Sequence, residues 1–306
     1  MNHLIVDGLG LAFRAHFANM LLTNSLGELS GCVYGTLNSL RSLKKKYPGF
    51  HFVFAWDNEP RRKRALFADY KASRPAFQLG PQVHDLKEIL SCLNITQAES
   101  SGEEADDVIA TLAEHYSEFG QVFIHSGDKD LLQLVKDGKV IVIRPKKGEE
   151  KTYDEEAVKE EYGVTPEDFP CYLSFRGDSV DDIPGVKNLR SKVITYLTNK
   201  YRMPRPIYAS LGEERLTDFQ RESLWDNENQ IYINYDLIKL KNDLDVLERP
   251  GHPDSCRLQE LLDKYEIKSI PSDGLIRMFD SEGDFGFRSS PSVKNHSLFD
   301  EGEFVV

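Results

Sequence analysis

The sequence predicts an α/β fold in which a mainly parallel central sheet is flanked by helices and followed by a helical C-terminal subdomain. Up to about residue 150, short apolar runs of strand type alternate with helical patterns, an order typical of a parallel sheet. Three of the apolar runs end in acidic residues, at Asp7, at Asp57, and at Asp128 with Asp130. After about residue 150 strand patterns become scarce, which predicts the helical region.

The elements of the first half follow from hydrophobic periodicity and from helix breakers. Val33, Leu37 and Leu40 have helical spacing, and Pro48-Gly49 ends that helix. A basic, poorly periodic stretch from about 58 to 82 follows the second strand. Strands are predicted at 4–7, 51–56, near 95, 121–125 and 139–143. Helices are predicted after the first strand, over 33–47, over 83–93, after Ser101, and from 131 to about 135.

Composition and periodicity divide the chain into three parts. Residues 1–150 form the predicted α/β core, which includes the basic stretch. Residues 151–270 form the predicted helical subdomain, with helical patterns at 154–175 and after the turn around Gly185. Residues 271–306 are predicted to be a flexible tail, because most of this segment is rich in Gly, Ser and Asp and shows little periodicity.

The composition is that of a soluble protein. The chain has 306 residues, of which 40% are hydrophobic and 29% charged, and its mean hydropathy is −0.46. No apolar run approaches the roughly 18 residues that span a membrane, and the N-terminus does not look like a signal peptide. The four cysteines are scattered, which favours free thiols in a reducing compartment. We therefore expect a cytoplasmic protein with no membrane partner.

The formal net charge of −12 is unevenly distributed along the chain. Residues 186–206 contain six Lys or Arg and no acid, and residues 61–74 contain six against Asp69 alone. Two basic segments on an acidic chain indicate localised contacts with a polyanion. Solvated helix faces are the alternative interpretation, and most charge runs are of that kind.

The acidic residues predict a centre for divalent metal ions. Hard cations prefer oxygen ligands, and proteins hold Mg²⁺ with a few carboxylates together with waters and substrate phosphates. So many acids exceed the needs of one ion and indicate two sites, which would clamp the attacking and leaving oxygens of a phosphoryl displacement. The four sets are Asp7 with Asp57; Glu104 with Asp106 and Asp107; Asp128 with Asp130; and Asp178 with Asp181, next to Asp182.

Each acidic set taken alone also has a structural interpretation. Ser101 and Glu104 fit a capping box, Asp128 could cap a helix, and the acids near Gly185 could form a turn. Capping explains the adjacent pair Asp106-Asp107 poorly, because neighbouring carboxylates repel and a helix start needs only one. The sequence has no GxSxG, Walker A or GxGxxG motif that would favour a different chemistry.

Five segments resemble the 5′-nuclease family, which includes flap endonucleases, phage 5′-3′ exonucleases and the 5′-nuclease domain of bacterial DNA polymerase I. In order, over roughly residues 3–270, they are VDGLGLAFRAHFA, FAWDNEPRRKRALFADYKASRP, SGEEADDVIATLA, HSGDKDLLQLV and GDSVDDIPGV. The resemblance implies a PIN-like 5′-nuclease fold with a helix-hairpin-helix-type subdomain. It also implies a nuclease that uses two Mg²⁺ ions, for which Mn²⁺ substitutes. Its expected substrates are DNA with 5′ ends, flaps or nicks, and RNA–DNA hybrids. The expected setting is a bacterial or phage-infected cell, in which the protein acts as a monomer.

The resemblance also implies roles for individual residues. The first metal site falls on Asp7, Asp57, Glu104, Asp106 and Asp107, and the second on Asp128, Asp130, Asp178 and Asp181. The stretch at 58–82 matches the family's helical arch, through which a 5′ single strand passes. Within it, Lys71 and Arg74 are expected to meet the scissile phosphate, with Arg14 near the site. The implied DNA contacts are Arg61, Arg62, Lys63, Arg64, Tyr70, Lys187, Arg190 and Lys192.

The chain departs from the family pattern at two places. Asp182 stands where the family usually has Asn in DNIPG, so the extra charge either alters the second metal site or faces solvent. In the hairpin, where the family usually reads GVxGIGxK, Asn188 can adopt a left-handed backbone, but Arg190 replaces a glycine. We therefore expect side chains rather than backbone N–H groups to contact the duplex phosphates.

Several alternatives remain open from the sequence. The first is a catalytically silent DNA-junction-binding protein of the same fold. A haloacid-dehalogenase-type phosphatase would need an acid where Leu9 stands, and a Toprim domain would leave Asp7 and Asp57 unused. Residues 295–299 match a bacterial clamp-binding peptide in their last three positions, so a sliding clamp is one candidate partner and a packed chain end the other interpretation. The absence of a polymerase segment suggests a stand-alone replication or repair enzyme.

Overall fold

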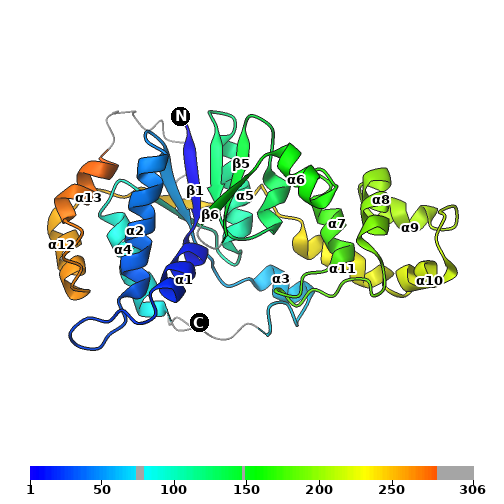
Figure 1. Ribbon diagram of the computed structural model, residues 1–306, viewed down its shortest axis with the longest axis horizontal. Coiled ribbons are helices and arrows are strands. Elements are labelled where there is room, and N and C mark those ends of the chain that lie inside the picture. Colours follow the sequence, from blue (N-terminus) through cyan, green and yellow to red (C-terminus); the bar gives the residue numbers. More distant parts are fainter. Residues whose placement is uncertain (74–78, 147–148, 281–306) are drawn as a thin grey trace.

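The structure is a computed structural model that describes residues 1–73, 79–146 and 149–280 (Figure 1). In these residues the sheet has seven strands in the order β6-β5-β4-β1-β2-β3-β7. The strands are β1 His3–Asp7, β2 His51–Ala55, β3 Thr96–Glu99, β4 Val122–His125, β5 Val140–Lys146, β6 Glu149–Tyr153 and β7 Leu247–Arg249. The five central strands are parallel, and β6 and β7 pair antiparallel at the two edges. The predicted mainly parallel sheet is therefore confirmed.

Alternate residues of the central strands supply two separate hydrophobic cores. Leu4 and Val6 of β1 join one core, whereas Ile5 joins the other, because successive side chains of a strand point to opposite faces. The Leu4 face is covered by α1 Gly8–Ala18, α2 Gly31–Lys46, α4 Gly80–Ser91, α12 Ser255–Lys264 and α13 Ser272–Phe279. The Ile5 face is covered by α5 Ala105–Tyr116 and, after β4, by the short 3₁₀ helix Asp130–Leu134.

The helices after β6 extend the second core into an elongated end of the molecule, which carries α8 to α10 in Figure 1. They are α6 Glu155–Tyr162, α7 Phe169–Arg176, α8 Ser191–Tyr201, α9 Pro204–Ser210, α10 Asp218–Asp226 and α11 Glu228–Ile238. Asn234 of α11 is fully buried and donates to the carbonyls of Ser174 and Pro184. These bonds fix the loop between α7 and α8, which contains Asp178 and Asp181.

The predicted boundaries need correction at the C-terminal side. Residues 247–279, assigned to the subdomain and tail, return to the α/β core as β7, α12 and α13. The reason is apolar burial, since Leu275 and Phe279 of α13 lie in the same core as Phe52 of β2. The predicted tail therefore begins too early, and its remainder, with the clamp-like segment 295–299, lies outside the described residues.

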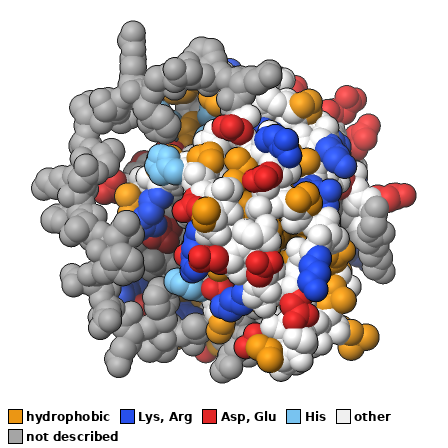
Figure 2. Space-filling model, turned by 90° about the vertical axis from the view of Figure 1, so that its left-hand side faces the viewer, with side chains coloured by type: hydrophobic (Ala, Val, Ile, Leu, Met, Phe, Trp, Pro, Cys, Tyr) orange, Lys and Arg blue, Asp and Glu red, His pale blue; other side chains and the backbone are white. Residues whose placement is uncertain are grey.

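The end of the molecule formed by α12 and α13 carries a mixed surface charge. Figure 2 shows acidic and basic side chains interspersed over the described part of this face. Such mixing gives little net attraction for a polyanion. Among the described residues, no helix has the length and apolar character needed to cross a membrane.

Candidate active site

Asp7 and Asp57 lie where β1 and β2 end, as the sequence predicts. Asp7 caps α1: its Oδ1 accepts from the Gly10 N–H at 2.8 Å, and its Oδ2 accepts from the Ser126 hydroxyl at 2.8 Å. A side chain at Gly10 would overlap this carboxylate, because a Cβ there would lie 2.1 Å from Asp7 Oδ2. Burial raises the pKa of Asp7, and burial followed by the Asp7 charge raises the pKa of Asp57 to about 6.

The N-terminus of α5 is capped by a residue that follows strand β2. Asp57 Oδ1 accepts from the Ala105 N–H at 2.9 Å, whereas Glu104, the N-cap residue, makes no side-chain capping bond. The capping-box interpretation of Ser101 and Glu104 is therefore wrong. In the first turn of α5, burial and then the Asp128 charge raise the pKa of Asp106 well above its ordinary value. The contribution of the Asp128 charge indicates that Asp106 lies near the acids that follow β4.

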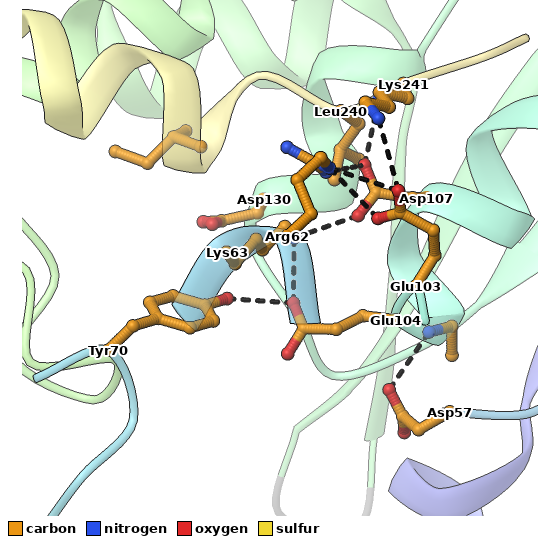
Figure 3. Close-up of polar contacts among 12 residues, drawn as sticks. Asp57, Arg62, Lys63, Tyr70, Glu103, Glu104, Asp107, Asp130, Leu240 and Lys241 are labelled. Atoms are coloured by element: carbon orange, nitrogen blue, oxygen red, sulfur yellow. Dashed lines mark hydrogen bonds and ion pairs between the residues drawn. The ribbon is translucent and has the colours of Figure 1, made fainter. Parts of the chain in front are cut away.

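Glu104 is surrounded by partners from the basic segment (Figure 3). Its Oε2 accepts from Lys63 Nζ at 2.7 Å and from the Tyr70 hydroxyl at 2.9 Å. Its Oε1 accepts from Lys71 Nζ at 2.5 Å. Burial alone would raise the pKa of Glu104, but Lys63 and Lys71 lower it to about 2. The carboxylate is therefore ionised, with one oxygen held by Lys63 and Tyr70.

Asp107 belongs to a neighbouring ion-pair network and not to the group at the strand ends. It pairs with Arg62 at 3.1 Å and with Lys63 at 3.1 Å, and it accepts from the Lys241 N–H at 2.9 Å. Arg62 and Lys241 also pair with Glu103, as Figure 3 shows. Lysines also contact both Glu104 oxygens, but the Glu104 charge helps to raise the pKa values of Asp57 and Asp106, so this carboxylate lies near them at the strand ends. Asp107 faces Arg62, Lys63 and Lys241 instead, and we leave it out of the metal ligands proposed below, in contrast to the sequence-based set.

A second acidic group forms where the chain after β4 meets the loop after α7. Asp130, Asp178 and Asp181 are all buried, and each offers a carboxylate oxygen within 4.8 Å of the others. Asp128, whose Oδ1 accepts from the Asp130 N–H at 2.8 Å, lies beside them. Burial and then the charges of Asp128, Asp178 and Asp181 raise the pKa of Asp130 well above its ordinary value.

The electrostatics of this group fit a divalent cation. Asp130 Oδ1 is buried and has no hydrogen-bond partner among the described residues. Lys129 pairs with Asp178 at 2.8 Å and supplies one positive charge from the protein. A hard cation bound here would reduce the repulsion among the clustered carboxylates and would coordinate the buried oxygen that lacks a hydrogen-bond donor.

The structure describes two of the three predicted catalytic cations. Lys71 Nζ lies 2.5 Å from Glu104 and 3.9 Å from Asp181, so it joins the two acidic groups. Arg14 of α1 is partly buried, and burial lowers its pKa while the Asp7 charge opposes the shift. One guanidinium nitrogen, Nη2, is buried without a hydrogen-bond partner among the described residues. Arg74 lies outside the described residues.

Two of the predicted DNA contacts are instead interior residues. Lys63 is 3% exposed and Tyr70 is 4% exposed, and both hold Glu104. In this structure both side chains therefore hold Glu104, and their assignment as DNA contacts stays a prediction. Arg62 is largely engaged by Glu103 and Asp107. The other predicted contacts are exposed, namely Arg61, Arg64, Lys187, Arg190 and Lys192.

The loop before α8, where the family has its hairpin, contains one residue with the left-handed backbone that the sequence suggested. Asn188 has φ +62°, in the left-handed region, as expected for a residue that replaces glycine there. Arg190 has an extended backbone and stands immediately before α8. The side chains of Lys187, Arg190 and Lys192 are all exposed at this end of the helix.

Sequence reasoning missed the role of the basic segment as a counter-charge. Four acids in five residues, Glu103 to Asp107, cannot be buried together without cations. The four consecutive basic residues at 61–64 were the available signal. Ser126 and Lys129, which hold Asp7 and Asp178, gave no comparable signal.

Comparison with known proteins gives a consistent result. Residues 2–163 match the family model of the 5′-3′ exonuclease, N-terminal resolvase-like domain. A 5′-3′ exonuclease of Aquifex aeolicus is 37% identical over 275 residues, which are 87% of this chain and 92% of that protein. DNA polymerase I of Pseudomonas aeruginosa is 34% identical over 302 residues, which are 94% of this chain but only 33% of the polymerase.

Two solved structures share the fold. The T5 D15 protein co-crystallised with metal ions has a TM-score of 0.65 at 19% identity, and the match covers 91% of this chain and 99% of that one. The catalytic core of Rad2 in complex with DNA substrate has a TM-score of 0.58 at 16% identity, covering 90% and 91%. At these identities the likeness concerns the fold.

Proposed function

This chain belongs to the 5′-3′ exonuclease family, and we propose on that basis that it is a Mg²⁺-dependent nuclease acting at 5′ ends and flaps of DNA. The observation that carries the proposal is the convergence of buried acids at the strand ends. Asp130, Asp178 and Asp181 come within 4.8 Å of one another, and Asp7, Asp57 and Asp106 have pKa values raised by burial and by neighbouring acids.

The proposed metal ligands fall into two groups. The first is Asp7, Asp57, Glu104 and Asp106, and the second is Asp128, Asp130, Asp178 and Asp181. Divalent ions bound there would lower the pKa of a water molecule and neutralise charge on the transferring phosphoryl oxygens. Mn²⁺, which accepts the same oxygen ligands, is expected to substitute.

The cations of the chain itself would orient the scissile phosphate. Lys71 lies beside both acidic groups, so a phosphodiester at the strand ends would meet its ammonium. Arg14 adds a partly desolvated guanidinium from the α1 side. Fixed positive charge next to developing negative charge is a large catalytic term in phosphoryl transfer. The expected products are a 5′-phosphate and a 3′-hydroxyl.

The DNA duplex is proposed to lie along the exposed basic residues of the α7–α8 region. Lys187, Arg190 and Lys192 are exposed, and the segment 186–206 contains no acid. The Rad2 neighbour, recorded with a DNA substrate, supports DNA as the substrate class. RNA–DNA hybrids are proposed as a further substrate, because contacts to phosphate oxygens alone do not distinguish deoxyribose from ribose.

A panel of labelled substrates tests the proposal. A 5′-flap, a nicked duplex and a single strand are incubated with Mg²⁺, with Mn²⁺ or with EDTA, and the product ends are mapped. We expect cleavage at the flap and at the nick with either metal and none with EDTA. Tight junction binding without cleavage in any metal would favour the catalytically silent alternative.

A further inference from the structure

Two short segments from distant parts of the chain are joined beside the acidic groups. The Lys71 N–H donates to the Asp181 carbonyl at 3.2 Å. The carboxylate of Asp182 accepts from the Ser73 N–H at 2.9 Å and from the Ser73 hydroxyl at 2.7 Å. We call these three hydrogen bonds the clasp. They tie the basic segment after α3 Arg61–Leu66 to the loop that carries Asp178 and Asp181.

The clasp includes two residues with left-handed backbones. Lys71 has φ +55° and Asp182 has φ +58°. Residues other than glycine rarely adopt this region and keep it where the surrounding structure fixes them, often at functional sites. Aspartate tolerates the region better than lysine does. The clasp therefore supplies a physical reason for the turn at Lys71, which the expected helical arch would not contain.

The turn decides where the Lys71 side chain lies. Its ammonium is placed 2.5 Å from Glu104 and 3.9 Å from Asp181, between the two acidic groups. Fixing the head of a long flexible side chain costs rotamer freedom, and a backbone that the clasp already holds adds no further loss of backbone freedom to that cost. Among the described residues, the contacts of Asp182 with the segment that carries Lys71 are made to Ser73.

We propose that Asp182 is a positioning residue that, through Ser73, holds segment 71–73 in the turn that aims Lys71 at the acidic groups. The proposal rests on the proposed function, in which Lys71 meets the scissile phosphate. It also accounts for the family departure at this position. A carboxylate has two acceptor oxygens for the two Ser73 donors, whereas asparagine has one and would turn its NH₂ group toward the other donor.

The first test needs neither metal nor DNA. Amide hydrogen exchange over residues 69–73 is measured on a millisecond timescale in EDTA for the wild type, Asp182→Asn and Ser73→Ala. Asparagine also tolerates a positive φ, so the backbone at 182 is not newly strained. Asp69→Asn is the control, because it removes an exposed charge next to the same segment without touching the clasp. We expect faster exchange in both clasp variants and unchanged exchange in the control.

The second test separates positioning from binding. With flap DNA and Mg²⁺ at saturating enzyme, Asp182→Asn should lower the single-turnover rate about tenfold, the scale of losing a charge-assisted hydrogen bond, while the dissociation constant stays within about twofold. Asp182→Asn placed in a Lys71→Ala background should cause no further loss. An equal loss in that background would show that Asp182 does not act through Lys71.

The outcomes distinguish this proposal from the proposed function. A wild type that cleaves no DNA would overturn the nuclease assignment and the role of Lys71 together. An active wild type with Asp182→Asn indistinguishable from Asp69→Asn in rate and exchange would overturn the positioning role alone. Non-additive effects of Ser73→Ala and Asp182→Asn would support it, because both remove the same clasp.

Discussion

In the metal-free fold, the ionised form of the Asp130 side chain is disfavoured. Burial and three neighbouring acids raise its pKa, so the ionised side chain at neutral pH destabilises the folded state relative to the unfolded chain. In EDTA at pH 7, Asp130→Asn should increase the free energy of unfolding by about 1 kcal/mol or more, measured by urea denaturation. Below the pKa of Asp in the unfolded chain, about 4, the side chain is protonated in both states and no longer destabilises the fold. The gain in the free energy of unfolding should therefore vanish as the pH falls below that value.

The same substitution should abolish function. With Mg²⁺, Asp130→Asn should reduce flap cleavage by orders of magnitude while DNA binding in Ca²⁺ persists. Asp69→Asn, at an exposed position, is the matched control and should leave both quantities unchanged. Wild-type turnover by Asp130→Asn would rule out a metal-ligand role for this residue.

Lys71 is predicted to act in the chemical step. Its ammonium lies between Glu104 and Asp181, where it could stabilise charge that develops on the phosphoryl oxygens. Lys71→Ala should lower single-turnover cleavage at saturating enzyme by roughly 10²-fold, the scale of losing one preorganised stabiliser. The dissociation constant for flap DNA should change far less. A normal saturated rate with weakened binding would mean that Lys71 only attracts the substrate.

At the residue scale the sequence identifies acids better than their partners. Asp7 and Asp57 could be predicted because a strand pattern ends at each and parallel strands end at one edge of a sheet. The roles of Lys63 and Asp182 could not. A buried lysine and an exposed one look alike in a charge run, and the partners of these residues lie 41 and 109 positions away in the chain.

The element that joins the basic segment to the core is α3. Lys63 of α3 is buried between Glu104 and Asp107. Removing one partner of a buried ion pair leaves uncompensated charge, so Lys63→Met should lower the free energy of unfolding by about 3 kcal/mol. Arg61→Met, on the same helix but exposed, should change it by less than about 0.5 kcal/mol. Equal effects in denaturation experiments would show that the buried network is not stabilising.

The loop and start of α8 are predicted to bind duplex backbone. Replacing Lys187, Arg190 and Lys192 by Gln should weaken binding equally for all sequences. It should also flatten the slope of log K against log salt by about 0.9 for each lost phosphate contact. A control with three exposed lysines elsewhere, Lys45, Lys139 and Lys268, should keep the wild-type slope. An unchanged slope in the first variant would make this segment an ordinary surface.

Elements were predictable where their periodicity is local. The parallel strands and α2 follow from apolar runs and from helical spacing. The short antiparallel β7 was not predictable, because its three residues are exposed and it is defined by pairing with β3 rather than by its own pattern. The return of α12 and α13 depends on contacts with Phe52 and its neighbours, which are far away in sequence.

At the scale of the whole molecule, the fold brings acids from five stretches of chain to one place. Their order along the sequence indicated a metal centre, but only the packed sheet and the loop held by Asn234 set which acids meet. Asp107 shows the difference, since its sequence neighbour Asp106 joins the acidic groups while Asp107 pairs with Arg62 and Lys63.

Anomalous diffraction from crystals soaked in Mn²⁺ tests the metal centre most directly. The expected result is one peak among Asp130, Asp178 and Asp181 and a second beside Asp7, Asp57 and Asp106. A cluster on α4, His84 with Asp85 and Glu88, serves as the internal control. It should stay empty because Lys264 and Tyr265 already contact Asp85. Crystals soaked in saturating Mn²⁺ that show no anomalous peak at the strand ends would contradict the proposed metal centre.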